Sequence, residues 1–386
     1  MVAAALLLSE GRGGAGVPLL SGDPARMWGC QLRQALCSVH HQLKKSFGIL
    51  PASTHWHHTV PTSPSCAWQL NDGHLELKYR DTLMRFDYFW LRDHCRSPSC
   101  YNTKTNQRSL DTASVDLTIK PQAVRVDETT LFLTCEFLEF CVSKAKVKLL
   151  EHSNVLGDFV QDESGGGEKY SSRISLIRET IYGRMWYFTS DFSRGDTAYT
   201  KLALDRHTDT TYFQEPCGIQ VFHCLRHEGT GGRTLLVDGF YAAEQVLQRA
   251  PEDFDLLTKV PLRHEYIENM GSCRNHMIGV GPVLNIYPWN KELYLIRYNN
   301  YDRAVINTVP HETVHRWYIA HRTLTTELRR PENELWVKLK PGKALFVDNW
   351  RVLHGRESFT GYRQLCGCYL TRDDVLNTAR FLGLQA

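Results

Sequence analysis

The stretch GIQVFHCLRHEGTGGRTLLVDG, residues 218–239, decides the fold class. Its two apolar runs, 218–225 and 233–239, are rich in Val, Ile, Leu and Phe and have the length of single strands. The sequence GTGG at 229–232 separates them, and clustered glycines are typical of a turn. The stretch is therefore predicted to be two strands joined by a loop.

The chain from residue 173 onward repeats this pattern. The further strand candidates are LRHEYI (262–267), VLNIY (283–287), ELYLIRY (292–298), WVKLK (336–340) and ALFVDNWRVLH (344–354). Two helices are expected between them, one after Asp238 as N-cap and one from about His311 to Arg329. Many short strands with few helices predict a mainly β sandwich or barrel, and they argue against a doubly wound parallel sheet.

The residues before 173 divide into three segments. Residues 1–54 are poor in acids and carry an amphipathic, basic pattern from Met27, which predicts a mitochondrial presequence or a disordered leader. Residues 55–134 contain the strand candidates HLELKY (74–79), LMRFDYFWL (83–91) and VRVDETTLFLT (124–134), which predict a small β-rich domain. Residues 135–172 include SGGGEK and are interpreted as an atypical linker, leaving 173–386 as the main domain.

Composition narrows the class of protein. The chain has 386 residues of which 42% are hydrophobic, so it can bury a large core. A net charge of +3 with no dense basic run argues against nucleic acid as a partner. No stretch approaches the ~20 apolar residues of a membrane span. The 12 cysteines show no C-x-x-C pattern, which favours reduced thiols in an intracellular compartment.

His207-Thr208-Asp209 is the first candidate for a metal site. Residues two apart on a strand point to the same side, so these two side chains are expected to share one ion. The triplet is weak by itself, because 17 histidines and 42 acids among 386 residues produce one or two such triplets by chance. A second does occur, at His74-Leu75-Glu76.

A third ligand is offered by His354, at the predicted tip of the strand 344–354. Two histidines and one carboxylate form the facial triad that leaves three positions on Fe(II) open. A bidentate 2-oxo acid takes two of them and dioxygen takes the third. Taken alone, His354 is equally well explained as an ordinary histidine at a strand end.

An anchor for the 2-oxo acid is expected further along the chain. Arg363 follows His354 by nine residues, and a planar guanidinium binds a carboxylate through two hydrogen bonds. Thr234 could add a hydroxyl. The competing interpretation of Arg363 is a surface arginine.

Three stretches carry a resemblance to a known family. HTDTTYFQEPCGIQVFHCL, GTGGRTLLVDGF and NWRVLHGRESFTGYRQLCGCYLTRDD closely resemble the trimethyllysine and γ-butyrobetaine dioxygenases of carnitine biosynthesis. HWHHT and MRFDYFWLRDHC extend the resemblance to residues 55–134, and it is stronger toward the trimethyllysine branch. It implies a double-stranded β-helix (jelly roll) with flanking helices, preceded by a small β-rich domain.

The resemblance also implies an activity and its cofactors. The activity is Fe(II)- and 2-oxoglutarate-dependent hydroxylation of N6,N6,N6-trimethyllysine by O2 to the 3-hydroxy derivative, the first step of carnitine biosynthesis, in the mitochondrial matrix. His207, Asp209 and His354 are then the iron ligands, Arg363 and Thr234 bind 2-oxoglutarate, and ascorbate keeps the iron reduced. A homodimer is left open.

A substrate cage is implied by the same resemblance. The pattern Tyr-Gly-x-x-Trp of the γ-butyrobetaine enzymes falls on Tyr182 and Trp186, and a tyrosine eight residues before the first iron ligand falls on Tyr199. Aromatic faces hold a trimethylammonium group, which has no N–H donors. Asp196 is a further anion for a cationic part of the substrate. Without the resemblance, these aromatic residues would be read as core packing.

The sequence departs from the family in two places. Cys95 and Cys100 match two of the zinc ligands of the γ-butyrobetaine enzymes, but Ser97 replaces the third cysteine, which leaves only His94 as a substitute ligand. Residues 135–172 do not resemble the family and are shorter, as in a splice variant or a faulty gene model. The alternatives are therefore hydroxylation of γ-butyrobetaine and a non-catalytic isoform.

Overall fold

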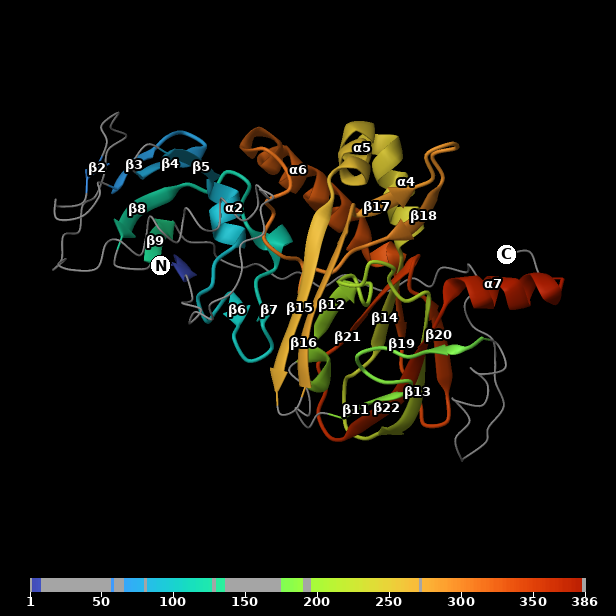
Figure 1. The fold of residues 1–386 in the computed structure, drawn as a ribbon. Coiled ribbons are helices and arrows are strands. Elements are labelled where there is room, and N and C mark those ends of the chain that lie inside the picture. The colour runs from blue at the N-terminus through green and yellow to red at the C-terminus, as the bar shows by residue number, and fades with distance from the viewer. Residues whose placement is uncertain are drawn as a thin grey trace, which may run out of the picture. The chain divides into compact units, whose positions relative to one another are not determined.

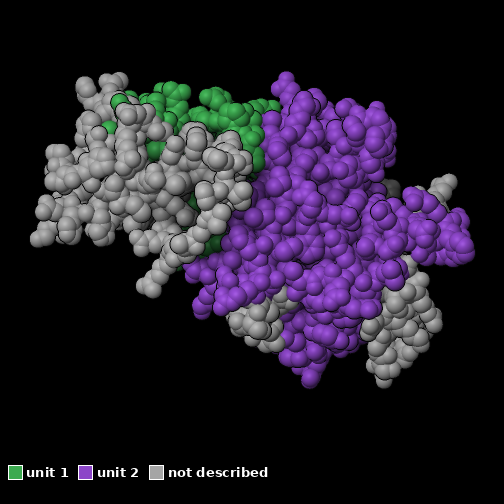
Figure 2. Space-filling view, viewed as in Figure 1, with its two compact units in different colours: residues 1–101, 109–143, 305–319 green, residues 102–108, 144–304, 320–386 purple. Residues whose placement is uncertain are grey.

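The computed structural model describes residues 2–7, 57–58, 66–79, 82–126, 130–135, 175–189, 196–270 and 273–383. The chain forms two compact units, shown in Figure 2. Unit 1 contains residues 1–101, 109–143 and 305–319, and unit 2 contains 102–108, 144–304 and 320–386. The predicted helical face in the leader lies outside the described residues, as does almost all of the predicted linker.

Unit 1 is built from two antiparallel sheets. One has the order β2 (His57–His58), β3 (Cys66–Leu70), β4 (His74–Tyr79) and β5 (Thr82–Asp87). The other has the order β1 (Val2–Leu7), β9 (Thr130–Cys135) and β8 (Pro121–Val126). Trp68, Leu75, Leu77 and Met84 form part of its core, so alternating strands bury one face. Strand β1 lies in the segment 1–54, where no strand was predicted.

The predicted strand LMRFDYFWL is wrong after Asp87. Residues Tyr88–Asp93 form helix α2 instead. The Asp87 carboxylate accepts a hydrogen bond of 2.9 Å from the Trp90 amide and so caps the helix. A local cap thus overrides the strand propensity of the aromatic residues. The short elements that follow are β6 (Tyr101–Asn102), β7 (Gln107–Arg108) and η1 (Thr112–Ser114).

The two largest sheets of unit 2 are antiparallel, and the chain visits them in turn (Figure 1). The first has the order β10 (Ile177–Arg178), β22 (Arg363–Leu370), β13 (Ile219–His227) and β20 (Ala344–Asp348), and β11 (Trp186–Phe188) also pairs with β22. The second has the order β12 (Leu204–His207), β21 (Val352–Arg356), β14 (Thr234–Asp238) and β19 (Glu334–Val337). This alternation is the predicted double-stranded β-helix, and Phe222, Leu236 and Leu345 belong to its core.

The predicted single strand 344–354 is two strands that belong to different sheets. The chain turns between β20 and β21, where the Asp348 side chain accepts from the Trp350 amide at 3.1 Å. The Asp348 carbonyl accepts from the Arg351 amide at 3.1 Å. An aspartate that bonds the backbone two residues on stabilises such a turn. His354 consequently lies in the middle of β21 and not at a strand tip.

The remaining elements of the chain flank the sheets (Figure 1). They are η2 (Thr197–Tyr199), α4 (Gly239–Arg249), α5 (Pro251–Lys259), β15 (Leu262–Met270), β16 (Cys273–Gly281), β17 (Leu284–Ile286), β18 (Leu293–Ile296), α6 (His311–Leu328), η3 (Pro331–Asn333) and α7 (Arg372–Phe381). The two predicted helices are confirmed as α4 and α6, and Asp238 caps α4 as expected. Helices α5 and α7 and strand β16 were not predicted. Within the described ranges, no helix is long and apolar enough to cross a membrane.

Candidate active site

Three predicted ligands meet at the edge of the second sheet of unit 2. His207 ends β12 and is paired across the strands with His354 of β21. The Asp209 Oδ1 atom lies 3.2 Å from Nε2 of His207 and 3.7 Å from Nε2 of His354. One ligand atom from each residue lies within 4.8 Å of the others, so all three can bind one ion. The structure therefore brings together residues that are far apart in the sequence.

The strand argument for Asp209 was wrong, although the residue is in the predicted place. Strand β12 ends at His207, so Asp209 lies in the following turn. The Asn349 side chain fixes this turn, since its Oδ1 accepts from the Asp209 amide at 2.7 Å and its Nδ2 donates to the Asp209 carbonyl at 3.1 Å. Thr210 follows with a φ of 56°, which is strained for a β-branched residue. The Asp209 side chain is therefore positioned by the two hydrogen bonds that Asn349 makes with its backbone and not by the alternation of side chains along a strand.

Neighbouring groups orient the ligand atoms. Nδ1 of His207 lies 2.7 Å from the Asp205 carbonyl oxygen, which can only accept, so Nδ1 is protonated and Nε2 is the ring nitrogen turned toward Asp209. Oδ2 of Asp209 accepts hydrogen bonds from the Gln220 amide and from the Tyr369 hydroxyl at 2.9 Å. The other carboxylate oxygen, Oδ1, therefore remains available on the side of the two histidines.

The electrostatics of the triad suit a cation. Burial alone would raise the pKa of Asp209, but the charge of His354 and the hydrogen bond from His207 hold it well below its usual range. Burial lowers the pKa of His354 to about 4. At neutral pH the Asp209 carboxylate is thus ionised and the His354 imidazole is neutral, which are the states that bind a metal. Two imidazole nitrogens and one carboxylate oxygen fit an Fe(II) facial triad.

Arg363 is buried and not on the surface. It begins β22, and only 5% of the residue is exposed. Among the described residues no carboxylate pairs with its guanidinium, whose nearest ring is Phe359 at 5.6 Å from Cζ to the centroid. Burial lowers the pKa of Arg363. A buried cation without a counter-ion is unfavourable unless an anion binds there.

A second buried arginine, Arg356, uses both terminal nitrogens in hydrogen bonds, whereas its Nε atom has no partner among the described residues. Its guanidinium donates to the carbonyls of Ala198 at 3.0 Å, Thr200 at 2.8 Å and Leu202 at 2.9 Å. It thereby fixes the segment that leads into β12. Thr234 is buried and pairs with Arg356 across the strands, but no hydrogen bond joins Thr234 to Arg363 in the described part of the chain. Of the two arginines, Arg363 makes no hydrogen bond to a carbonyl or carboxylate among the described residues, and Arg356 keeps its Nε–H unpaired, so both present a donor to an anion.

Two of the three predicted cage residues lie in one aromatic cluster. The Trp186 ring is 4.4 Å from the Phe188 ring and 5.9 Å from the Tyr369 ring, and Tyr199 is 4.8 Å from Phe188. Trp186 and Tyr199 are each only 2% exposed. Tyr369 also bonds Asp209, so this cluster adjoins the metal ligands. Trp186 fits because its cross-strand partner is Gly367, where a Cβ atom would lie 2.1 Å from the indole ring.

The third cage residue, Tyr182, belongs to a neighbouring set of tyrosines. Its hydroxyl lies 2.5 Å from the Tyr212 hydroxyl, and the Tyr212 ring stacks on Tyr266 with centroids 4.8 Å apart. Asp196, the predicted anion, precedes η2, and its carboxylate accepts from the Ala198 amide at 2.9 Å. Burial raises the pKa of Asp196. The charge of Asp196 contributes to the raised pKa of both Tyr182 and Tyr212, so Asp196 lies near these tyrosines.

Several functional residues were missed by sequence reasoning. They are Gln220, Tyr369 and Asn349, which orient Asp209, and Tyr212 and Tyr266, which extend the aromatic wall. Each comes from an element distant from the motif that it supports. No local pattern marks them, and only the pairing of the strands brings them to the site.

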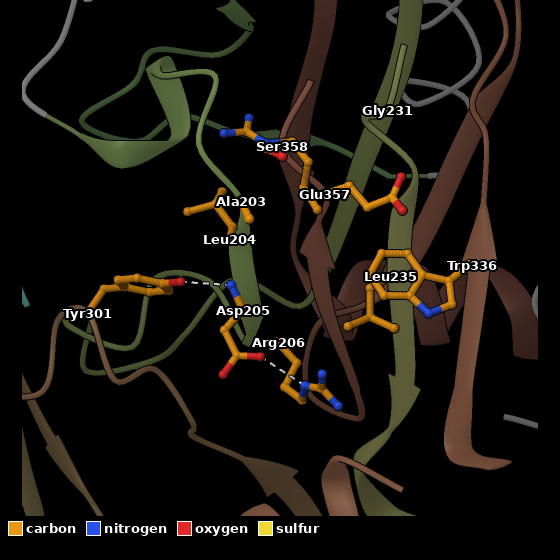
Figure 3. A pocket seen from close by; sticks show the side chains of 11 residues that line it. Ala203, Leu204, Asp205, Arg206, Gly231, Leu235, Tyr301, Trp336, Glu357 and Ser358 are labelled. Atoms are coloured by element: carbon orange, nitrogen blue, oxygen red, sulfur yellow. Dashed lines mark hydrogen bonds and ion pairs between the residues drawn. The ribbon is translucent and has the colours of Figure 1, made fainter. Parts of the chain in front are cut away.

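A pocket of about 580 Å³ lies on another part of unit 2 (Figure 3). Asp205, Arg206, Leu235, Tyr301 and Trp336 are among its lining residues, whereas the three ligands are not. Asp205 and Arg206 are engaged there in ion pairs with each other and with Arg329 and Glu334. The pocket is also lined by Arg356 and Glu357, and it includes residues of β12 and β21, the strands that carry the two histidines.

Among the described residues of unit 1, no third ligand joins Cys95 and Cys100 at the matching zinc position. Cys95 and Cys100 are both buried free thiols, and the Cys95 thiol lies 3.1 Å from the Ser97 hydroxyl. His94 cannot substitute, because Nδ1 bonds the Trp90 carbonyl at 2.7 Å and Nε2 accepts from the Ile306 amide at 3.2 Å. Arg92 donates to the Cys100 sulfur at 3.1 Å, which favours a thiolate there without a metal.

Comparison with known proteins assigns the class of this fold and site. Residues 161–369 match the family described as "Taurine catabolism dioxygenase TauD, TfdA family". Residues 67–134 match "Gamma-butyrobetaine hydroxylase-like, N-terminal". The class is thus a dioxygenase built on the double-stranded β-helix, with the small N-terminal domain predicted from the sequence.

The similar relatives narrow this class. A mitochondrial trimethyllysine dioxygenase of Gallus gallus is 67% identical over 419 residues, which cover 93% of this chain and 100% of the relative. That of Homo sapiens is 68% identical over 388 residues, covering 88% and 92%. A gamma-butyrobetaine dioxygenase of Pongo abelii is 25% identical over 354 residues, covering 76% and 90%. The chain therefore belongs to the trimethyllysine dioxygenases of the TauD/TfdA family.

Proposed function

We propose that this protein hydroxylates N6,N6,N6-trimethyllysine to its 3-hydroxy derivative, with Fe(II), 2-oxoglutarate and O2, as the first step of carnitine biosynthesis. The observation that carries the proposal is the convergence of His207, Asp209 and His354 on one point. The names of the relatives support the choice of substrate.

The chain supplies ligands and a site for each small molecule. Bound Fe(II) would activate O2 and couple the oxidative decarboxylation of 2-oxoglutarate, to succinate and CO2, to hydroxylation of the substrate. His207, Asp209 and His354 hold the metal on one side and leave the other open. Gln220 and Tyr369 keep the Asp209 carboxylate in one orientation, and ascorbate would keep the iron reduced.

Arg363 is the proposed anchor for 2-oxoglutarate. Its buried guanidinium has no carboxylate partner among the described residues, and the distal carboxylate of 2-oxoglutarate would neutralise it through two charge-assisted hydrogen bonds. Thr234, buried on β14, would add a hydroxyl donor. Arg356 holds the backbone beside this site through its terminal nitrogens, and its unpaired Nε–H could donate a further hydrogen bond.

The aromatic walls suit a trimethylammonium group. Trp186, Tyr199 and Tyr182 are the proposed cage, and each ring face contributes about 0.5–2 kcal/mol to holding a cation. Asp196 adds a negative charge beside the tyrosines. An aromatic cage excludes water and needs no N–H donor on the ligand, which distinguishes it from a site for an unmodified lysine.

The decisive experiment compares two substrates. The purified protein is supplied with Fe(II), 2-oxoglutarate and ascorbate, and product is followed by mass spectrometry with trimethyllysine or with γ-butyrobetaine. Faster hydroxylation of trimethyllysine supports the proposal, whereas a preference for γ-butyrobetaine would replace it with the rival activity. Size-exclusion chromatography with light scattering would show whether the protein is a homodimer.

The location is proposed to be the mitochondrial matrix. The relatives are named mitochondrial, and residues 1–54 contain few acids and an amphipathic basic stretch. Expression with a fluorescent tag at the C-terminus, with and without residues 1–54, tests this. Retention of the mitochondrial signal after removal of the segment would contradict a presequence.

A non-catalytic isoform remains the second candidate, because residues 135–172 depart from the family. The alignment with the human relative runs over 388 positions but uses only 88% of this chain, so the relative has residues without a counterpart here. In favour of catalysis, the three ligands and the strands β11 to β22 all lie after residue 172. Expressing this chain beside the human relative, and comparing thermal unfolding and turnover, decides between the two.

A further inference from the structure

Asp302 is a buried carboxylate that the proposed chemistry does not use. It lies between β18 and α6 and is only 6% exposed. One oxygen accepts from the Gln107 amide at 3.0 Å and the other from the Asn299 amide at 2.9 Å. Both donors are neutral, and no described residue forms an ion pair with Asp302. Its negative charge is thus buried with hydrogen bonds from neutral amides and without an ion-pair partner among the described residues.

The two amides are locked in the orientation that suits a carboxylate. The Gln107 oxygen accepts from the Thr197 amide at 3.0 Å and from its hydroxyl at 2.7 Å, so the nitrogen must face Asp302. The Asn299 oxygen accepts from the Tyr301 amide at 2.9 Å, which turns its nitrogen the same way. The amide nitrogens of Gln107 and Asn299 both point to Asp302 as donors, and the two carboxylate oxygens of Asp302 accept one hydrogen bond each. Each carboxylate oxygen still has a further lone pair for a ligand.

Asp302 lies next to both the metal centre and the aromatic walls. The Asn299 amide that bonds it also lies 3.4 Å from the carbonyl of Thr208, the residue between His207 and Asp209. Gln107 ties Asp302 to Thr197, which follows Asp196. Besides burial, the charge of Asp302 is the leading cause of the raised pKa of Tyr212. The amides that hold Asp302 therefore contact the backbone between two metal ligands and the residue that follows Asp196.

The two cationic groups of trimethyllysine have different chemical needs. The trimethylammonium group has no N–H donor and binds aromatic faces. The α-ammonium group has three N–H donors and requires acceptors, best supplied by a carboxylate. γ-Butyrobetaine has a trimethylammonium group but no amino group. A second buried carboxylate beside the cage therefore matches the substrate that carries two positive charges.

We propose that Asp302 binds the α-ammonium group of trimethyllysine and is the residue that selects an amino acid over a betaine without an amino group. The inference rests on the proposed function and adds a specificity residue to it. Gln107 and Asn299 are positioning residues, because they hold the Asp302 carboxylate and act on the substrate only through it.

The test removes one charge at a time. The variant Asp302→Asn removes the negative charge of the protein, and a substrate without the α-amino group removes the positive charge of the ligand. Trimethyllysine is compared with 6-(trimethylammonio)hexanoate, which has the same chain without the α-amino group, in the iron-loaded protein with 2-oxoglutarate. For Asp302→Asn, kcat/KM for trimethyllysine is expected to fall about 10- to 100-fold, as for a lost charge-assisted hydrogen bond. For the desamino compound it is expected to change less than about threefold, since that compound makes no such bond. Glu76→Gln, the same change in unit 1, is the matched control and should alter neither.

Each outcome has a separate meaning. An equal loss on both compounds would show that Asp302 is structural and would overturn the inference. Absence of trimethyllysine hydroxylation by the wild-type protein would instead overturn the proposed function. Because Asp302→Asn places an amide against a locked donor and could impair folding, the wild-type protein is also tested by ligand-induced thermal shift without oxygen. Equal shifts with the two compounds would equally overturn the inference.

Discussion

The two His-x-acid triplets of this chain have nearly the same pair geometry and different surroundings. In unit 2, His207 and Asp209 approach to 3.2 Å, and in unit 1, His74 and Glu76 approach to 3.4 Å. Only the first pair meets a third ligand within the described residues, which is His354. Glu76 instead accepts from Arg85 of the neighbouring strand at 2.9 Å.

The difference teaches that the triplet itself carries little information. His74 and Glu76 lie two apart on a true strand, as the sequence argument required, and yet they form an ordinary surface pair with Arg85. His207 and Asp209 do not lie on one strand, and yet they form the site, because Asn349, Gln220 and Tyr369 hold the carboxylate from other elements. Convergence of distant elements, and not local spacing, makes the metal centre.

The largest effect is expected when a metal ligand is removed. The matched controls change the corresponding residues of the triplet in unit 1. His207→Ala, Asp209→Ala and His354→Ala should each abolish turnover and iron binding, since each removes one of three protein ligands. His74→Ala and Glu76→Ala should keep both. Turnover and bound iron are measured side by side on all five variants. Near-normal iron-dependent hydroxylation in any of the first three would remove the basis of the metal assignment.

The next comparison concerns two arginines. Arg363 is the proposed anchor for 2-oxoglutarate, and Arg85 is the partner of Glu76 in unit 1. Arg363→Ala should raise the 2-oxoglutarate KM by about 30-fold or more, because a buried charge-assisted pair contributes about 2 kcal/mol or more. Arg85→Ala, which removes the partner of Glu76, should leave that KM unchanged. Initial rates at varied 2-oxoglutarate and fixed trimethyllysine give the values. A selective rise in the KM for trimethyllysine would refute the assigned role of Arg363.

The support of the carboxylate is tested by Gln220→Leu. This change removes one hydrogen bond from Oδ2 of Asp209 while keeping a side chain of similar size. The loss of such an orienting partner typically weakens metal binding about 10- to 100-fold. Asn71→Leu, which removes a neighbour of His74 at 3.2 Å, is the matched change in unit 1 and should leave iron affinity unaltered. Equal iron affinity in the wild type and Gln220→Leu would show that Tyr369 alone orients Asp209.

A smaller effect is expected in the aromatic cage. Trp186→Ala should weaken trimethyllysine more than 2-oxoglutarate, by about 0.5–2 kcal/mol in the cation–π contact plus the loss of packing against Gly367. Trp68→Ala, in the core of unit 1, is the control for a buried tryptophan outside the site. The KM values for both small molecules are compared. Equal weakening of both would make Trp186 a packing residue and would misplace the cage.

The sequence was sufficient for many of the strands and for naming three residues that the structure brings together, and insufficient for how those residues are held. Period-two patterns and turn residues reflect local burial, so β4, β13, β14, β15 and both predicted helices could be found. The division of 344–354 into β20 and β21 depends on which sheet each half joins, and this is a non-local property. The same is true of Asn349 and Tyr369, which meet Asp209 from distant positions. Asp302 carries no motif, and only its amide partners and its burial mark it.

The last and smallest expected effect is a pH dependence of the preference for trimethyllysine. It depends on Asp302 in unit 2 and is not expected to depend on Glu76 in unit 1. Burial, and the charge of Asp196, raise the pKa of Asp302 to about 7, while His207 opposes and Asp209 reinforces the rise. A raised pKa means that the carboxylate takes up a proton as the pH falls through this value, and it then loses its attraction for an α-ammonium group. The ratio of kcat/KM for trimethyllysine to that for 6-(trimethylammonio)hexanoate should therefore fall between pH 8 and pH 6, by about tenfold at most. Taking the ratio cancels titrations that affect both substrates alike, including those of the iron ligands.

Glu76 differs, because hydrogen bonds from Arg85 and His74 outweigh its burial and lower its pKa, so it stays ionised over this range. Glu76→Gln should leave the pH profile of the ratio unchanged, whereas Asp302→Asn should flatten it, and a ratio that is constant with pH in the wild-type protein would contradict the titration of Asp302.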